Sequence, residues 1–368
     1  ISTPLFLTCA RFRSSPQKYE LMTRKFLVLS LLLLAFLLNI SVATFAAGAE
    51  TEEGKEDPTG FIMHHIKDSH EWHFFNVGHT HITLPLPVIT YASDRGLEFY
   101  KSSDFQNPET HKFGKEYAHN GIYIDDHEHL GRVDGGAILD FSLTKNVAMM
   151  LIVIALVLYM ALSAAGHYKK HGAVAPKGAA SLVEPIVIFV RDEIAHKAIG
   201  PKYMKFVPYL LTLFFFIWIG NLLGLLPGAA NLTGNIAVTF TLAMLTFIIV
   251  NVNGNKDYWK HVFATPGVPV ALLPIIVVVE FIGLFTKPFA LMVRLFVAIT
   301  AGHIVILAFI SLVFIFESYA IGVVSTLMVT FINMIELLVA TIQAYVFTLF
   351  TAMYIGGAVA EHHHDDHH

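Results

Sequence analysis

Two long stretches without any charged side chain constrain the fold of this chain more than any other feature. Residues 146–165 form one uncharged run, and residues 206–253 form a second that is far too long for one membrane crossing. An α-helix needs about 20 consecutive apolar residues to cross a bilayer. The composition agrees, with 55% hydrophobic and only 14% charged residues. The chain is therefore predicted to be an all-α polytopic membrane protein rather than a soluble one.

About five transmembrane helices are expected in a membrane domain of residues 141–361. The second uncharged run is broken at residues 224–235 by Gly, Pro and Asn, which indicates two helices joined by a short external turn. Residues 270–316 and 318–360 are longer than an average span, so the last two helices should form a long, tilted hairpin. Residues 181–200 have an apolar and a charged helical face, which predicts an interfacial amphipathic helix.

The residues before the first span are expected to lie outside the cytoplasm. Residues 1–49 are interpreted as a leader with a signal peptide from Met22, since a basic start, an apolar stretch and a small-residue cleavage site follow. An uncleaved anchor helix is the alternative. Residues 50–140 are polar and acidic, and their alternation, as in residues 81–91, favours short strands. Lysines gather after the first span, which marks the cytoplasmic side and places the C-terminus there.

Histidines are concentrated in this extracytoplasmic segment and in a His/Asp-rich tail, residues 362–368. The candidates for metal ligands are His64, His65, His70, His73, His127 and His129. No cysteine accompanies them, because the only one is Cys9 in the leader, and no zinc spacing is matched. A solvated or pH-responsive surface is expected instead, and no metal or cofactor is assigned.

The apolar residues 270–316 contain Glu280, Lys287, Arg294 and His303. A charge in hydrocarbon costs about 2.5 to more than 10 kcal/mol, so an arginine there is a functional-site hypothesis. Arginine cannot release its proton. Arg294 can therefore act only as a fixed positive charge, and it needs an anion nearby. Lys287 has a second interpretation, in which its long side chain extends to the membrane interface.

Helical spacing divides these groups between two faces. Glu280, Lys287 and Arg294 are seven residues apart, so they fall close to one seam of a helix. Small residues beside the seam allow another helix to approach, so Arg294 is expected to face a partner and not lipid. His303 follows nine residues later, half a turn around the helix, and should face a different neighbour.

The last helix adds Asn333, Glu336 and Gln343 to the polar groups. Intramembrane chains of titratable residues are typical of proton relays. The alternatives are that Asn333 and Gln343 only hydrogen-bond between helices, and that Glu336 is a buried neutral carboxyl. One mechanism uses them all: protons pass the region of His303 and Glu336 to a mobile carboxylate of a partner subunit, whose anion Arg294 stabilises.

The sequence KPFALMVRLFVAITAGHI (residues 287–304), with Glu280 upstream and ATIQAYVFTLFTAMYI (residues 340–355) downstream, resembles subunit a of the rotary F-type ATP synthase. The turn NLLGLLPGAANLTGNIAVT (residues 221–239) resembles the same family. The resemblance extends over residues 205–361 and hardly reaches the residues before the first span.

This resemblance implies a proton-translocating stator subunit of a bacterial inner membrane, with two half-channels leading to the c-ring. It implies that Arg294 is the essential arginine, that Gln343 lies near it, and that Glu280 belongs to the cytoplasmic-side pathway. The implied partners are the c-ring, the b-type stator subunits and the lipid bilayer. No P-loop motif GxxxxGK[ST] is present, so the chain is expected to bind neither nucleotide nor nucleic acid and not to be an enzyme itself.

The chain departs from the common bacterial pattern of that family in three places. Val297 and Ala298 stand where the pattern has Gly-Asn, and His303 stands where it has Glu. Glu336 stands where it has His, so the acid and the imidazole are exchanged, as in mitochondrial-type relatives. The loss of an amide at Ala298 puts a polar contribution there in doubt.

Two other classes of function compete with this interpretation. A stand-alone secondary transporter for metals or protons is the main alternative, and it predicts inverted repeats and broken helices, which the sequence lacks. An intramembrane metalloprotease would need an HExxH motif, which is also missing.

Overall fold

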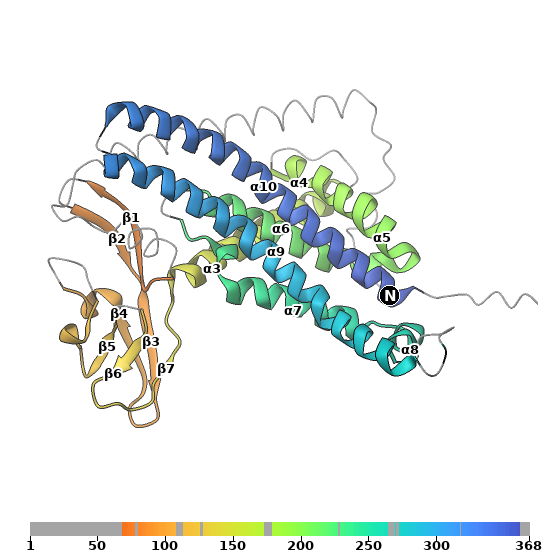
Figure 1. Cartoon of the computed structure of the whole chain (residues 1–368), viewed down its shortest axis with the longest axis horizontal. Helices are drawn as coiled ribbons and strands as arrows, with labels where there is room; N and C mark the ends of the chain where they lie inside the picture. The colour runs from red at the N-terminus through yellow and green to blue at the C-terminus, as the bar shows by residue number, and fades with distance from the viewer. Residues whose placement is uncertain are drawn as a thin grey trace, which may run out of the picture.

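The computed structural model contains a small β-rich unit followed by a bundle of long helices (Figure 1). It describes residues 68–77, 80–107, 113–125, 128–172, 179–226, 229–263, 269, 272–316 and 318–360. The leader, with the signal peptide predicted from Met22, and the tail, residues 362–368, lie outside the described residues. We call residues 68–140 the β-rich unit.

Short antiparallel strands build the β-rich unit. β1 (Glu71–Val77) pairs with β2 (Thr80–Pro85), β3 (Pro87–Ala92) lies between β4 (Gly96–Lys101) and β7 (Leu139–Asp140), and β5 (Ile122–Ile124) pairs with β6 (Leu130–Arg132). Two short 3₁₀ turns, η2 (Ser102–Phe105) and η3 (Lys115–Tyr117), connect them. Val88, Phe105, Ile122 and Ile124 form its core. The buried residues of β3 alternate along the strand, as the period-two pattern requires.

The first long helix, α3 (Lys145–His171), extends beyond the uncharged residues 146–165. Thr144 begins it as an N-cap, because its side chain accepts a hydrogen bond from the backbone N–H of Val147 at 3.5 Å. Gly172 ends it with φ 67°, a left-handed conformation that glycine adopts at little cost.

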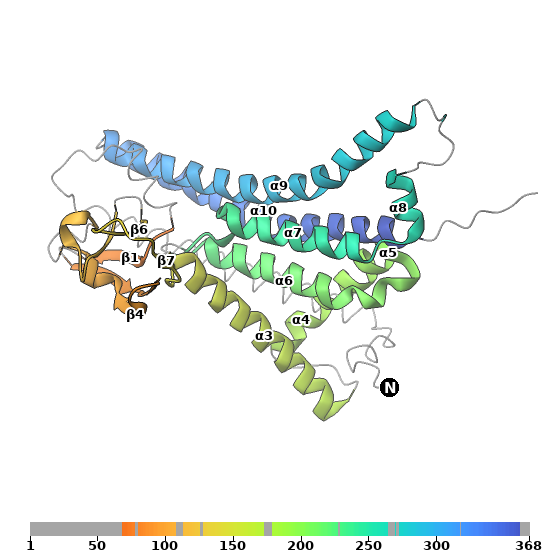
Figure 2. The same ribbon diagram turned by 90° about the horizontal axis from the view of Figure 1, so that it is seen from below.

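Five further helices and one turn form most of the rest of the membrane domain. They are α6 (Val207–Gly224), the turn η6 (Leu232–Gly234), α7 (Ile236–Val252), α8 (Lys256–Phe263), α9 (Leu273–Phe316) and α10 (Tyr319–Val359). α9 and α10 run side by side along one side of the bundle, with α7 and α6 beneath them and α3 farthest away (Figure 2). The β-rich unit lies at the end where α9 turns into α10.

The described helices fit a multi-pass membrane protein. α3, α6, α9 and α10 are each long and apolar enough to cross a membrane. α7 and α8 meet at a bend of 104°, and they give a fifth span only if the bent pair is counted as one. The expected count of five spans therefore stays a prediction.

The predicted amphipathic helix is present, and protein covers part of its apolar face while Ile188 and Phe189 stay exposed. α4 (Ala179–Ile188) continues through a π-helical segment, η4 (Phe189–His196), into α5 (Lys197–Ile199) and the 3₁₀ turn η5 (Gly200–Lys205). Val190, Ile194 and Ile199 are buried in the main core, where these segments contact α6 and α10. Part of the apolar stripe thus packs on neighbouring helices, and the position of this segment at the membrane interface stays a prediction. Helical periodicity cannot distinguish the two, since either partner is apolar.

The C-terminal end of α10 is held closely against α5 and α8. A Cβ atom at Gly356 would overlap the carbonyl oxygen of Ala198 and lie 3.0 Å from its carbonyl carbon. Asn255 donates from its backbone N–H to the carbonyl of Ala358 at 2.9 Å and from its side chain to that of Val359 at 2.7 Å. These bonds satisfy carbonyls that a helix end leaves unpaired.

Gly356→Ala should therefore destabilise the protein by about 2 kcal/mol or more, because α10 or α5 must move to admit the methyl group. Thermal unfolding of the purified protein in detergent measures this. Gly357→Ala is the matched control, since nothing lies within 4 Å of a Cβ there. Alanine in a helix is favoured over glycine by about 1 kcal/mol, so the control should be neutral or stabilised. Equal stability of the two variants would contradict the close contact.

Candidate functional site

Arg294 lies on a face of α9 that the described residues leave uncovered. Its side chain is exposed, and its guanidinium carbon lies 4.5 Å from the ring centroid of Phe350 on α10. One heptad earlier, the ammonium of Lys287 lies 5.8 Å from the ring centroid of Tyr354. Within the described part of the chain, no carboxylate forms a salt bridge with Arg294. The guanidinium thus rests on an aromatic face and is open on its other side.

The uncovered face follows the seam that the heptad spacing predicts. Glu280 is half-buried, while Lys287, Arg294 and Ala301 are exposed. Large apolar side chains flank these residues, including Val297 with 49% of its surface exposed. A fixed positive charge in an exposed apolar surface of a 44-residue helix is unfavourable unless a partner covers it.

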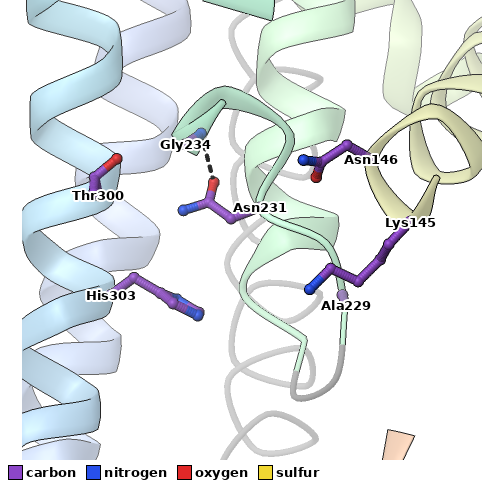
Figure 3. A pocket seen from close by; sticks show the side chains of 7 residues that line it. All are labelled: Lys145, Asn146, Ala229, Asn231, Gly234, Thr300 and His303. Carbon is purple, nitrogen blue, oxygen red and sulfur yellow. Dashed lines mark hydrogen bonds between the residues drawn. The ribbon is translucent and has the colours of Figure 1, made fainter. Parts of the chain in front are cut away.

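His303 projects from the other side of α9 into a small polar pocket (Figure 3). Three segments line it: Lys145 and Asn146 of α3, Ala229, Asn231 and Gly234 of the α6–α7 connection, and Thr300 and His303 of α9. The imidazole of His303 and the ammonium of Lys145 extend toward each other from opposite walls. Arg294 and His303 therefore lie on different faces of α9 and have different neighbours, as their spacing of half a turn predicts.

The pocket wall between α6 and α7 is fixed by local hydrogen bonds. The side-chain oxygen of Asn231 accepts from the backbone N–H of Gly234 at 3.0 Å and so caps η6. Asn221, buried on α6, accepts from the hydroxyl of Thr233 at 2.7 Å and donates to the carbonyl of Ala340 on α10 at 3.4 Å. In the sequence Asn231 looks like an ordinary turn residue, and no signal marks it as a pocket residue.

Glu336 lies between α10 and α9 with only 3% of its surface exposed. A Cβ atom at Gly302 would lie 2.9 Å from one of its carboxyl oxygens, so the carboxyl rests directly against that glycine. Neither oxygen has a hydrogen-bond partner among the described residues. Glu336 therefore meets α9 one position away from His303, which brings the acid and the imidazole to the same level of the bundle.

Gln343 and Glu280 lie apart from this level. Gln343 is half-buried one heptad after Glu336, about 10 Å farther along α10, and Phe350 follows after another heptad. Glu280 lies near the start of α9, where one of its carboxyl oxygens is 4.0 Å from Nδ1 of His261 on α8. No pattern in the sequence marks His261, because α8 is short and polar.

Comparison with known proteins decides the family. Residues 147–356, more than half of the chain, match the family described as ATP synthase A chain. The chain belongs to the ATP synthase A chain family. The ATP synthase subunit a of Chloroherpeton thalassium is 45% identical over 258 residues, which cover 66% of this chain and 77% of that relative. ATP synthase subunit a 2 of Prosthecochloris aestuarii is 38% identical over 353 residues, which cover 91% of this chain and 93% of that relative.

The family match confirms the resemblance and favours it over the stand-alone transporter. Glu280, Arg294, His303, Glu336 and Gln343 all lie within the part that matches the ATP synthase A chain. The residues before it have a different relationship, because residues 61–148 match a domain of unknown function. The β-rich unit and the first residues of α3 thus precede the match to the A chain family model, although the alignment with the Prosthecochloris aestuarii relative covers 91% of this chain.

His70 differs from the solvated or pH-responsive surface that we expected of the histidine-rich region, whereas His129 is exposed. His70 is buried, with 2% of its surface exposed, and its ring nitrogens lie 3.3 Å from a carboxyl oxygen of Glu128 and 3.5 Å from one of Asp140. The prediction was wrong for His70, because both partners are distant in sequence. His64, His65 and His127 lie outside the described residues. Among the residues that are described, no group of His, Cys, Asp and Glu could hold a metal ion.

Two acids change the charge state of His70. Burial alone would lower its pKa, but hydrogen bonds to Asp140 and Glu128, together with their charges, outweigh burial and raise the pKa from 6.5 to about 9. The protonated ring therefore stabilises the folded state. This contribution is fully present below pH 6.5 and is lost as the pH rises through 9.

We expect the stability advantage of the natural chain over His70→Gln to fall by about 3 kcal/mol between pH 6 and pH 10. Other titrating groups are common to both proteins, so the difference between their free energies of unfolding isolates His70. Chemical denaturation in detergent at a series of pH values measures it. A difference that does not change with pH would show that the ring is not charged in the folded protein.

Proposed function

We propose that this chain is the proton-translocating stator subunit a of a rotary ATP synthase in a bacterial inner membrane. Family membership supports this role, and the exposed Arg294 on the uncovered face of α9 is the observation that carries it. In this proposal the c-ring packs against this face of α9. The β-rich unit lies outside the cytoplasm, and the C-terminus lies in the cytoplasm. The c-ring and b-type subunits are its partners, and ATP chemistry belongs to other subunits.

Arg294 acts as a fixed cation that a carboxylate of the moving ring visits. The positive charge favours the deprotonated carboxylate, so the ring releases its proton when it reaches this point. Arginine suits this task because it stays protonated at every physiological pH. Its contact with Phe350 holds the guanidinium in place, since a cation over an aromatic ring gains about 0.5–2 kcal/mol.

Two half-channels reach the ring at different heights along α9. The first leads from the extracytoplasmic side through the pocket at His303 to Glu336, and the second leads from the cytoplasmic side to Glu280 beside His261. Along the helix axis, Arg294 is about 21 Å from Glu280 and about 14 Å from His303. A positive charge between the two openings repels hydronium, so protons cross only by travelling on the ring.

Arg294→Ala should abolish both proton-driven ATP synthesis and ATP-driven proton pumping in membrane vesicles, while the complex still assembles. Lys287→Ala is the matched control, because it removes a cation on the same seam that also lies over an aromatic ring. The control should keep most of the activity. Retained coupled transport in Arg294→Ala would exclude the proposed role.

Exchanging the acid and the imidazole, with His303→Glu and Glu336→His in one chain, should be much milder than replacing either residue by Leu. The exchange keeps two titratable groups where α9 and α10 meet, whereas a Leu replacement interrupts the relay and should slow proton pumping about tenfold or more. Rates of ATP-driven acidification compare the three variants. Equal losses in all of them would argue against a pathway through this pair.

A further inference from the structure

One face of the sheet β4–β3–β7 is apolar, and the described residues leave it largely uncovered. We call it the apolar sheet face, and it consists of Ile89, Tyr91, Leu97, Phe99, Leu139 and Phe141. Cross-strand pairing places Tyr91 between Leu97 and Leu139. It places Ile89 beside Phe99, and paired residues project from the same face. Ile89 is half-buried and the other five residues are exposed, Phe99 with 68% of its surface.

The opposite face of the same sheet already supplies the core of the β-rich unit. Val88, Thr90 and Ala92 alternate with the exposed residues of β3 and are buried. Val88 packs with Ile122 and Ile124 of β5. Because successive side chains of a strand point to opposite faces, the apolar sheet face looks away from β5 and β6. An antiparallel sheet in water would carry polar residues on this second face. An exposed apolar patch of this size marks a surface that binds something.

The apolar sheet face is attached firmly to the start of α3. The backbone N–H of Phe141 donates to the carbonyl of Ile89 at 2.9 Å, and that of Leu143 donates to the carbonyl of Pro87 at 3.0 Å. The hydroxyl of Ser142 accepts from the backbone N–H of Ile89 at 3.2 Å. The residues between β7 and α3 therefore continue the sheet as far as the first turn of the helix. Since α3 is long and apolar enough to cross a membrane, the sheet is held where this helix leaves the bilayer.

The apolar sheet face is directed toward the membrane. In Figure 2, β4 lies on the side of the β-rich unit toward which α3 runs, and β6 lies on the other side. The face that looks away from β5 and β6 therefore looks along α3. On α3 itself, the exposed side chains include Leu151, Leu158 and Leu162, as expected of a surface that contacts lipid. The exposed apolar surface of the sheet thus lies where the lipid-facing surface of the helix begins.

The composition of the apolar sheet face suits the boundary between headgroups and acyl chains. Tyr91, Phe99 and Phe141 supply three aromatic rings, and aromatic and large aliphatic side chains favour this boundary. Lys101, exposed beside Pro87 at the edge of the face, can extend its ammonium to lipid phosphates. A protein partner would have to lie between the sheet and the bilayer, whereas lipid is already there.

We propose that the β-rich unit rests on the bilayer surface at the N-terminal end of α3, with the apolar sheet face inserted among the lipid headgroups and upper acyl chains. The occupant of this face is lipid and not a second copy of the chain or another subunit. The inference does not depend on the proposed proton path. It gives a task to residues that match a domain of unknown function, which is to fix the start of α3 at the level of the headgroups.

Quenching of a fluorescent probe by lipid tests the contact. In a synthase whose other reactive cysteines are replaced, Cys9→Ser included, Phe99→Cys carries an environment-sensitive fluorophore. The complex is placed in nanodiscs of phosphatidylcholine and phosphatidylglycerol. A phosphatidylcholine with a nitroxide near the top of its acyl chain should quench this probe about threefold more strongly than a probe at Val133→Cys, because the apolar sheet face inserts about 5–10 Å into the interface. Iodide in the water should give the opposite order.

Val133 is the matched control, because it is equally exposed and directly follows β6 on the other side of the unit. Leu139→Cys, on β7, should behave like Phe99→Cys and gives an independent position if one variant does not assemble. Strong quenching of both sheet probes by iodide, with lipid quenching no greater than at Val133→Cys, would show a face open to water and overturn the proposal. Protection from both quenchers would show a protein partner and overturn it as well. Arg294→Ala, which decides the proposed function, should leave the quenching unchanged.

Discussion

An arginine in the middle of a membrane helix must have something other than lipid beside it, and the long hairpin of α9 and α10 is arranged around this constraint. Phe350 supports the guanidinium of Arg294 from one side, and the bundle leaves the other side open. The rest of the membrane domain packs on the opposite faces of the hairpin. The chain thus presents the guanidinium of Arg294 outward on a support of two packed helices.

The opposite faces of α9 perform separate tasks because a helix turns 100° per residue. The outward seam carries the fixed charge, and the inward side carries His303 and the glycine against which Glu336 rests. Titratable groups therefore lie close to the cation in sequence but are screened from it by the helix itself. This separation explains how a strong positive charge and a proton relay can share a single helix.

Periodicity and apolar runs predicted the long helices, the seam of Arg294 and the different orientation of His303. They could not predict contacts between residues distant in sequence. Lys145, 158 residues before His303, gave no signal beyond its place at the edge of a span. The partners of His70 could not be predicted for the same reason. The protein that covers part of the apolar face of η4 could not be predicted either, because an amphipathic pattern identifies a buried face but not what buries it.

The attachment of the last helix has a mechanical consequence under the proposed function. A rotating ring drags sideways on the face it passes, and α10 forms much of the hairpin that takes this load. The contact of Gly356 with Ala198 and the bonds from Asn255 join the end of α10 to α5 and to the turn before α8. Torque on the hairpin would then be shared with α5 and the turn before α8, which keeps the arginine at its height while the ring turns.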